Sequence, residues 1–152
     1  MQLSPATNRL TALSLALAAG GIAVSAYLTL VHYRDDLLVC AVGGCHTVQK
    51  SPYAELYGVP VAILGLGMFV AMLLLGLLRR IQPEWAESIT LITFGLALTG
   101  TVFTIYLTYL ELFVIHAVCQ WCVLTAVLTW VLLLVEGRLV LDTPLEELAE
   151  DR

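Results

Sequence analysis

Charged residues are scarce in this chain. Lys, Arg, Asp and Glu make up 12% of the 152 residues, whereas hydrophobic residues make up 60%. Soluble globular domains carry roughly a quarter charged residues and about half apolar ones. The excess of apolar residues indicates a chain that folds in lipid rather than in water.

Positive charge is scarcer still and is never clustered into a long run. The chain has 7 Lys and Arg residues against 12 Asp and Glu residues, a formal net charge of -5. Nucleic acid is therefore not expected as a partner. Cysteine is also sparse, but the 4 cysteines fall into two close pairs.

Charge is missing altogether from four long stretches, which predict four transmembrane helices. The expected spans cover about residues 10–32, 58–78, 88–110 and 114–135. A helix needs about 20 residues to cross the hydrocarbon core, and the strict alternation of a membrane β-strand is absent. Apolar residues of the first stretch continue past the small residues around Ala23, which favours a span over a cleaved signal peptide.

The predicted fold is an all-α integral membrane protein, a four-transmembrane-helix bundle with a loop between helices 1 and 2. The bundle is expected to occupy residues 1–137, and 138–152 to form a short acidic cytoplasmic tail. In this tail, Thr143 and Pro144 are typical of the start of a separate surface helix.

The positive residues predict the orientation of the bundle. A cytoplasmic N-terminus puts more of them inside (Arg9, Arg79, Arg80, Arg138 and Arg152) than outside (Arg34 and Lys50). The positive-inside rule favours this arrangement. We therefore expect an inner (plasma) membrane protein whose first loop is extracytoplasmic.

With this topology, both cysteine pairs lie at the outer face. Cys40 and Cys45 lie in the first loop, where Gly43 and Gly44 are expected to let the chain bend. Cys119 and Cys122 form a CxxC motif at the start of the last span, so both sulfurs lie on one helix face. The positive end of the helix dipole favours a thiolate there. The pattern indicates thiol–disulfide exchange.

Other interpretations of the cysteines stay open at this point. Four sulfurs also suit a structural zinc ion or static disulfides. The corresponding alternative function is a non-enzymatic tetraspan protein for metal handling or assembly, with the cysteines as ligands. A second enzymatic alternative is a protein that delivers electrons to the extracytoplasmic side instead of withdrawing them from thiols there.

The motifs together resemble the vitamin K epoxide reductase family, most closely bacterial members without a fused thioredoxin-like domain. The resemblance rests on the two cysteine pairs, Ser51, the sequence Gly58-Val59-Pro60 and Gly65. Animal members carry Thr-Tyr-Ala shortly after the CxxC motif. Here Thr125 is followed directly by Ala126, so epoxide reduction of the animal type is not expected.

The resemblance implies a quinone-dependent thiol–disulfide oxidoreductase. A soluble thioredoxin-like thiol oxidase is its expected partner, and ubiquinone or menaquinone its expected cofactor. The loop pair Cys40 and Cys45 would take electrons from the partner. Cys45 would then exchange with Cys119, and Cys122 would reduce the quinone. The result would be disulfide formation outside the cytoplasm.

Further residues are expected near the quinone. Ser51 matches a loop serine of the family, and Trp121 lies beside the sulfur that would face the quinone. Glu111 and His116 flank the outer end of the third and fourth spans. They serve either as interfacial anchors or as proton donors to the reduced quinone.

Overall fold

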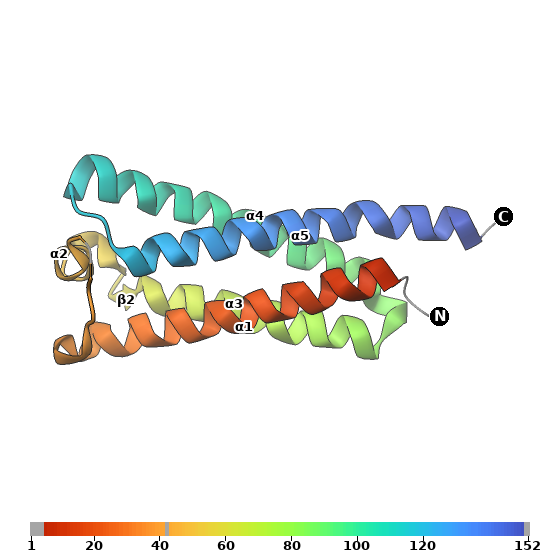
Figure 1. The fold of residues 1–152 in the computed structure, drawn as a ribbon, viewed down its shortest axis with the longest axis horizontal. Coiled ribbons are helices and arrows are strands. Elements are labelled where there is room, and N and C mark those ends of the chain that lie inside the picture. Colours follow the sequence, from red (N-terminus) through yellow and green to blue (C-terminus); the bar gives the residue numbers. More distant parts are fainter. Residues whose placement is uncertain (1–4, 42, 151–152) are drawn as a thin grey trace.

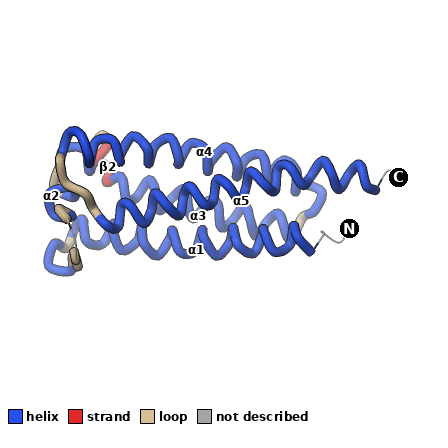
Figure 2. Tube along the Cα trace, turned by 45° about the horizontal axis from the view of Figure 1, so that its top comes forward, coloured by secondary structure: helices blue, strands red, loops and turns tan. Residues whose placement is uncertain are grey.

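Each of the four charge-free stretches lies mainly in one long helix of the computed structural model (Figure 1). The structure describes residues 5–41 and 43–150, without the side chains at 35 and 143–150. Four helices run side by side along one axis, namely α1 (Pro5–Tyr33), α3 (Val61–Ile81), α4 (Ala86–Leu110) and α5 (Gln120–Glu150) (Figure 2). The segments long and apolar enough to cross a membrane are Pro5–Tyr33, Val61–Ile81, Pro83–Ile115 and Gln120–Asp142. The predicted all-α membrane bundle is confirmed.

Short elements connect these helices. Between α1 and α3 lie η1 (Asp35–Leu37), α2 (Cys45–Gln49), η2 (Pro52–Ala54) and an antiparallel hairpin of β1 (Glu55–Leu56) and β2 (Val59–Pro60). The hairpin turns at Tyr57 and Gly58, which both have positive φ, as two-residue hairpin turns require. The 3₁₀ turn η3 (Pro83–Trp85) precedes α4, and a π-helical turn, η4 (Glu111–Ile115), follows it.

Several boundaries differ from those predicted. Pro60 was expected in the first turn of a helix, but it pairs with Glu55 in the hairpin, and α3 begins at Val61. The last helix begins at Gln120 because the π-helical turn and a loop occupy 111–119. The predicted helix start at Thr143–Pro144 is wrong, because α5 runs through it to Glu150.

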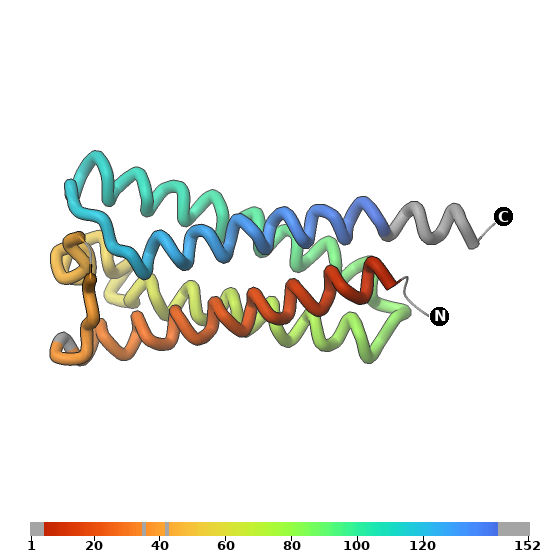
Figure 3. Tube along the Cα trace, viewed as in Figure 1, coloured from red at the N-terminus to blue at the C-terminus, as the bar shows by residue number. Residues whose placement is uncertain are grey.

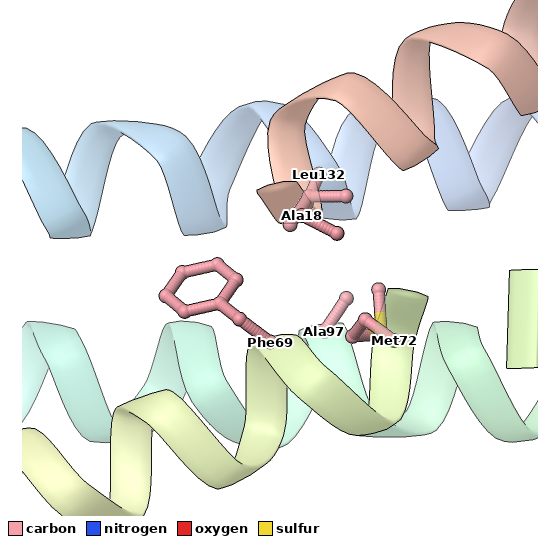
Figure 4. Packing of buried hydrophobic residues seen from close by; sticks show 5 residues of the cluster. All are labelled: Ala18, Phe69, Met72, Ala97 and Leu132. Atoms are coloured by element: carbon pink, nitrogen blue, oxygen red, sulfur yellow. The ribbon is translucent and has the colours of Figure 1, made fainter. Parts of the chain in front are cut away.

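All four long helices contribute to the hydrophobic core (Figure 4). Its buried residues are Ala18, Phe69, Met72, Ala97 and Leu132. The ring of Phe69 lies against Gly21, where an added Cβ would come within 2.3 Å of a ring atom. Gly21 and Ser25 of α1 are buried, whereas Ala19 and Ala23 are exposed.

A buried polar cluster joins the four helices toward the η3 end. Glu136 of α5 accepts hydrogen bonds from Arg79 at 3.0 Å, Thr93 at 2.8 Å and also Ser14. Arg79 donates further to Thr90 at 3.3 Å. Arg79 was expected at the inner surface, but it is only 3% exposed. It turns inward because the buried carboxylate needs a cation.

The elements between α1 and α3 gather with η4 at the end opposite η3, away from both described chain ends (Figure 3). The segment after α1 and the turn between α4 and α5 thereby meet. Of the inner-side cations used for the orientation, Arg152 lies outside the described residues.

Candidate active site

The structure brings all four cysteines to the end of the bundle that holds the short elements. Cys40 and Cys45 form a disulfide, with Cα atoms 6.1 Å apart. Cys119 precedes α5 and Cys122 lies in its first turn, and both are free thiols. Cys45 and Cys119 are fully buried in one cluster with Val48, and the other two cysteines pack against this cluster.

The loop that carries the disulfide docks on the backbone in front of α5. Gly43 forms a β-bridge with Cys119, and the Gly44 N–H donates to the Val118 carbonyl at 3.1 Å. A Cβ on Gly43 would lie 2.2 Å from that carbonyl oxygen, and the φ of Gly43 is +90°. The glycines therefore allow close backbone approach, whereas the sequence suggested only a loop that bends.

The two middle residues of the CxxC motif hold the chain just before Cys40. The Trp121 indole donates to the Val39 carbonyl at 2.9 Å, and the Gln120 amide donates to the same oxygen at 3.4 Å. The Val39 N–H donates to the Tyr27 hydroxyl at 3.0 Å. Trp121 and Tyr27 also pack ring on ring, with centroids 4.8 Å apart. These contacts fix the loop pair relative to the CxxC motif.

The turn that leads into the CxxC motif is built around Glu111. Its carbonyl accepts the Ala117 N–H at 3.1 Å, and its carboxylate accepts the Cys119 N–H at 3.1 Å. The intervening π-helical turn ends at His116, which has a left-handed φ of 54°. Glu111 is 5% exposed, whereas His116 is exposed. The sequence did not predict the burial of Glu111, because an acidic residue between two spans is normally solvated.

The thiol of Cys119 is unusually acidic. Cys119 lies between the third and fourth spanning segments. A hydrogen bond from the Cys122 side chain lowers the pKa of Cys119 to about 7, against the opposing effect of burial. Backbone hydrogen bonds at Cys122 and Trp121 lower this pKa further. Since the thiolate is the nucleophile in disulfide exchange, Cys119 is prepared for that reaction.

A cavity of about 380 Å³ lies inside the bundle next to the CxxC motif. Its wall is mostly apolar, and Ser51, Glu111 and Cys122 contribute polar atoms to it. Several lining hydroxyls are used within their own helices, such as that of Thr125, which donates to the Trp121 carbonyl at 2.9 Å. Trp121 itself is not among the described lining residues, because its indole faces Tyr27 and the loop. The volume is in the range of small-molecule binding sites.

Residues 12–136 match the vitamin K epoxide reductase family, and this range includes both cysteine pairs. The chain belongs to this family. It is therefore a multi-pass membrane protein and an oxidoreductase of thiol–disulfide chemistry. Members of the vitamin K epoxide reductase family work with quinones and redox partners.

Membership of this family helps to interpret how the four sulfurs are arranged. Within the described part of the chain, no three His, Cys, Asp or Glu side chains come together as a metal site. The loop sulfurs are instead bonded to each other. A loop disulfide beside a free CxxC pair corresponds to one state of a redox relay, which favours the oxidoreductase interpretation.

Proposed function

We propose that this protein oxidises a soluble thioredoxin-like partner and passes the electrons to a membrane quinone. The observation that carries this proposal is the position of the CxxC motif between two environments. Cys119 is buried against the loop pair, and Cys122 lines the cavity. One motif therefore contacts both the disulfide-exchange site and a pocket for a lipid-soluble oxidant.

Electrons enter at Cys40. This sulfur is half-buried, whereas Cys45 is fully buried. A thiolate of a soluble partner reaches Cys40 more easily, and its attack breaks the Cys40–Cys45 bond and releases Cys45. The neighbouring Val39 is 66% exposed, which provides an apolar contact for the partner beside the attacked sulfur.

Cys45 passes the electrons on to the CxxC motif. The second thiolate of the partner displaces Cys40, which leaves the partner oxidised and Cys40 free. The Cys45 thiolate attacks Cys119 of a Cys119–Cys122 disulfide and releases Cys122, and the freed Cys40 then displaces Cys119 from Cys45. The loop needs little movement for this step, because Gly43 and Gly44 already hold it against the backbone next to Cys119. The low pKa of Cys119 makes it a good leaving group in the second displacement.

The cavity suits a quinone as the terminal oxidant. Cys122 lies in the first turn of α5, two residues after Gln120, and it lines the cavity. The Ser51 hydroxyl donates to the Val48 carbonyl at 2.8 Å. Its oxygen can still accept a hydrogen bond, which suits the hydroxyl group of a hydroquinone. We therefore propose Cys122 and Ser51 as contacts of the quinone. Trp121 instead holds the loop in place.

The direction and the side of the membrane follow from chemistry and charge. A quinone-coupled relay keeps the bacterial periplasm oxidising, so electrons are proposed to flow from thiols to quinone. Arg79 no longer counts as a surface charge, but the exposed Arg9, Arg80 and Arg138 still lie at the end away from the cysteines. The proposal therefore keeps the active site on the extracytoplasmic face of the inner membrane.

Reconstitution tests the proposed function. The purified protein in detergent is mixed with a reduced thioredoxin-like protein and a soluble ubiquinone or menaquinone analogue, and quinone absorbance is followed. We expect reduction that needs all three components and stops in Cys40→Ser. Zinc or copper bound stoichiometrically by the four sulfurs, without quinone reduction, would refute the proposal.

A further inference from the structure

Glu111 stands out among the residues around the cavity. Of the described lining residues, it is the one that carries a carboxylate. It is 5% exposed, and no ion pair to it occurs in the described part of the chain. A buried ionisable residue inside a membrane bundle is costly, and such residues mark functional sites such as proton relays.

The contacts of Glu111 connect both reacting thiols with the cavity. Its Oε2 accepts the Cys119 N–H at 3.1 Å, and its carboxylate interacts with the Cys122 side chain. The π-helical turn and the left-handed His116 set this position, and π-helical turns occur often at functional sites. Glu111 and Cys122 therefore lie beside each other at the wall of the cavity where the proposed substrate would bind.

We propose that Glu111 is a catalytic acid–base that carries a proton from the Cys122 thiol to the quinone oxygen. This inference rests on the proposed function. Quinone reduction by a thiol pair must deliver two protons as well as two electrons. Among the other lining residues, Thr108 and Thr125 donate their hydroxyl protons to helix carbonyls, and Ser51 donates to Val48. Tyr53 also lines the cavity but is 43% exposed, so Glu111 is the buried acid at the cavity wall.

Quinone reduction starts from the reduced CxxC pair. The S–S bond between Cys119 and Cys122 forms while the S–H bond of Cys122 breaks, and two electrons pass from the sulfurs to the quinone. Glu111 accepts the Cys122 proton and gives it to one quinone oxygen, so the carboxylate ends as it began. Cys119 has already released its proton to water, and water supplies the second proton of the hydroquinone.

The test isolates the quinone step in the full-length protein. Replacing Cys40 and Cys45 by Ser leaves only the CxxC pair, which is reduced with dithiothreitol and mixed with a soluble ubiquinone analogue in a stopped-flow instrument. In this background, Glu111→Gln keeps an oxygen for the Cys119 N–H and removes the acid. The single-turnover rate at saturating quinone should fall about 10²-fold, the size of general acid–base catalysis. The half-saturating quinone concentration should stay unchanged.

Two further variants separate catalysis from structure. Glu111→Asp restores the acid and should recover part of the lost rate. The double variant Arg79→Leu/Glu136→Gln removes the other buried carboxylate together with its cation, and its folded fraction should reduce quinone at the parental rate. With the loop cysteines intact, Glu111→Gln should also leave Cys45–Cys119 exchange unchanged.

Three outcomes would overturn the inference. These are a parental quinone rate in Glu111→Gln, an equal loss of rate in Glu111→Asp and Glu111→Gln, or an equal slowing of the exchange step. Failure of the proposed function looks different, because the Cys40→Ser/Cys45→Ser background with Glu111 in place would then not reduce quinone at all.

Discussion

Among the described side chains, two glutamates are buried, one toward each end of the bundle, and their surroundings differ. Glu136 of α5 is held by the cation of Arg79 and by hydroxyl groups, from side chains of the three other long helices. Glu111 accepts one backbone N–H, from Cys119, and borders the cavity. The carboxylate of Glu136, which is paired with Arg79, holds the long helices together. The other has no such cation among the described residues and lies next to thiols that gain and lose protons.

The same contrast holds for the two ends of the molecule. Side chains that span the bundle hold the η3 end together. The cysteine end is assembled by contacts to the backbone of short segments, such as the bridge from Gly43 to Cys119 and the hydrogen bond from Trp121 to the Val39 carbonyl. Backbone contacts fix the spacing of the loop and the CxxC motif while leaving the sulfurs free to exchange partners. Changes at the cysteine end should therefore affect catalysis, and changes at the other end should affect stability.

The largest effect is expected at Cys122. Cys122→Ser removes the sulfur that lines the cavity and should abolish quinone reduction, because no electron pair can leave the CxxC motif toward the cavity. Exchange between Cys45 and Cys119 stays chemically possible, and mass spectrometry after non-reducing digestion should find the linked peptides. Cys40→Ser is the matched control, since it should stop turnover with the partner but preserve the quinone step. Quinone reduction by Cys122→Ser at the parental rate would refute the relay order.

At the other end, Arg79→Leu should destabilise the fold. It leaves Glu136 buried without its cation, and breaking a buried ion pair costs about 3–5 kcal/mol. The double variant Arg79→Leu/Glu136→Gln should recover most of this loss, because no buried charge remains unpaired. Denaturant unfolding in detergent micelles measures both. A double variant as unstable as the single one would show that the ion pair is not what stabilises this end.

Gly43→Ala tests whether backbone contact positions the loop. The added Cβ would lie 2.2 Å from the Val118 carbonyl oxygen, at a φ of +90°. Cys45–Cys119 exchange should slow by up to about 10²-fold, since misplacing reacting groups by about 1 Å costs that much. Gly58→Ala is the matched control, because Gly58 also has a positive φ, +82°, but nothing lies within 4 Å of its added Cβ. Equal effects of both variants on exchange would point to backbone strain alone.

The sequence predicted those features that depend on composition and local pattern. Long charge-free stretches are sufficient to identify membrane helices, and the CxxC motif at a span boundary indicates redox chemistry. The close approach of Gly43 to Val118 was not predictable, because it depends on how two distant segments pack. Arg79 and Glu136 are adjacent to apolar stretches, so each looked like an ordinary interfacial charge until the fold brought them together. Glu111 also looked like an interfacial charge in the sequence, because it lies between two apolar stretches.

The smallest expected change is a shift in the titration of Cys119. A hydrogen bond from Cys122 is the main cause that lowers the pKa of Cys119 to about 7. In a Cys40→Ser/Cys45→Ser background, thiolate absorbance should therefore rise with pH around a midpoint near this value. A thiol with the ordinary pKa of about 8.5 would be only slightly ionised at this pH.

The identity of residue 122 sharpens this test. Cys122→Ser keeps a hydroxyl donor and should preserve the low midpoint, whereas Cys122→Ala removes the donor and should move the midpoint upward. Because a lowered pKa favours the thiolate, the thiolate fraction of Cys122→Ala at neutral pH should be lower than that of Cys122→Ser. The same low midpoint in both variants would mean that the start of α5, and not residue 122, activates Cys119. Backbone groups at the cysteine end would then set the acidity of the Cys119 thiol as well as the position of the loop.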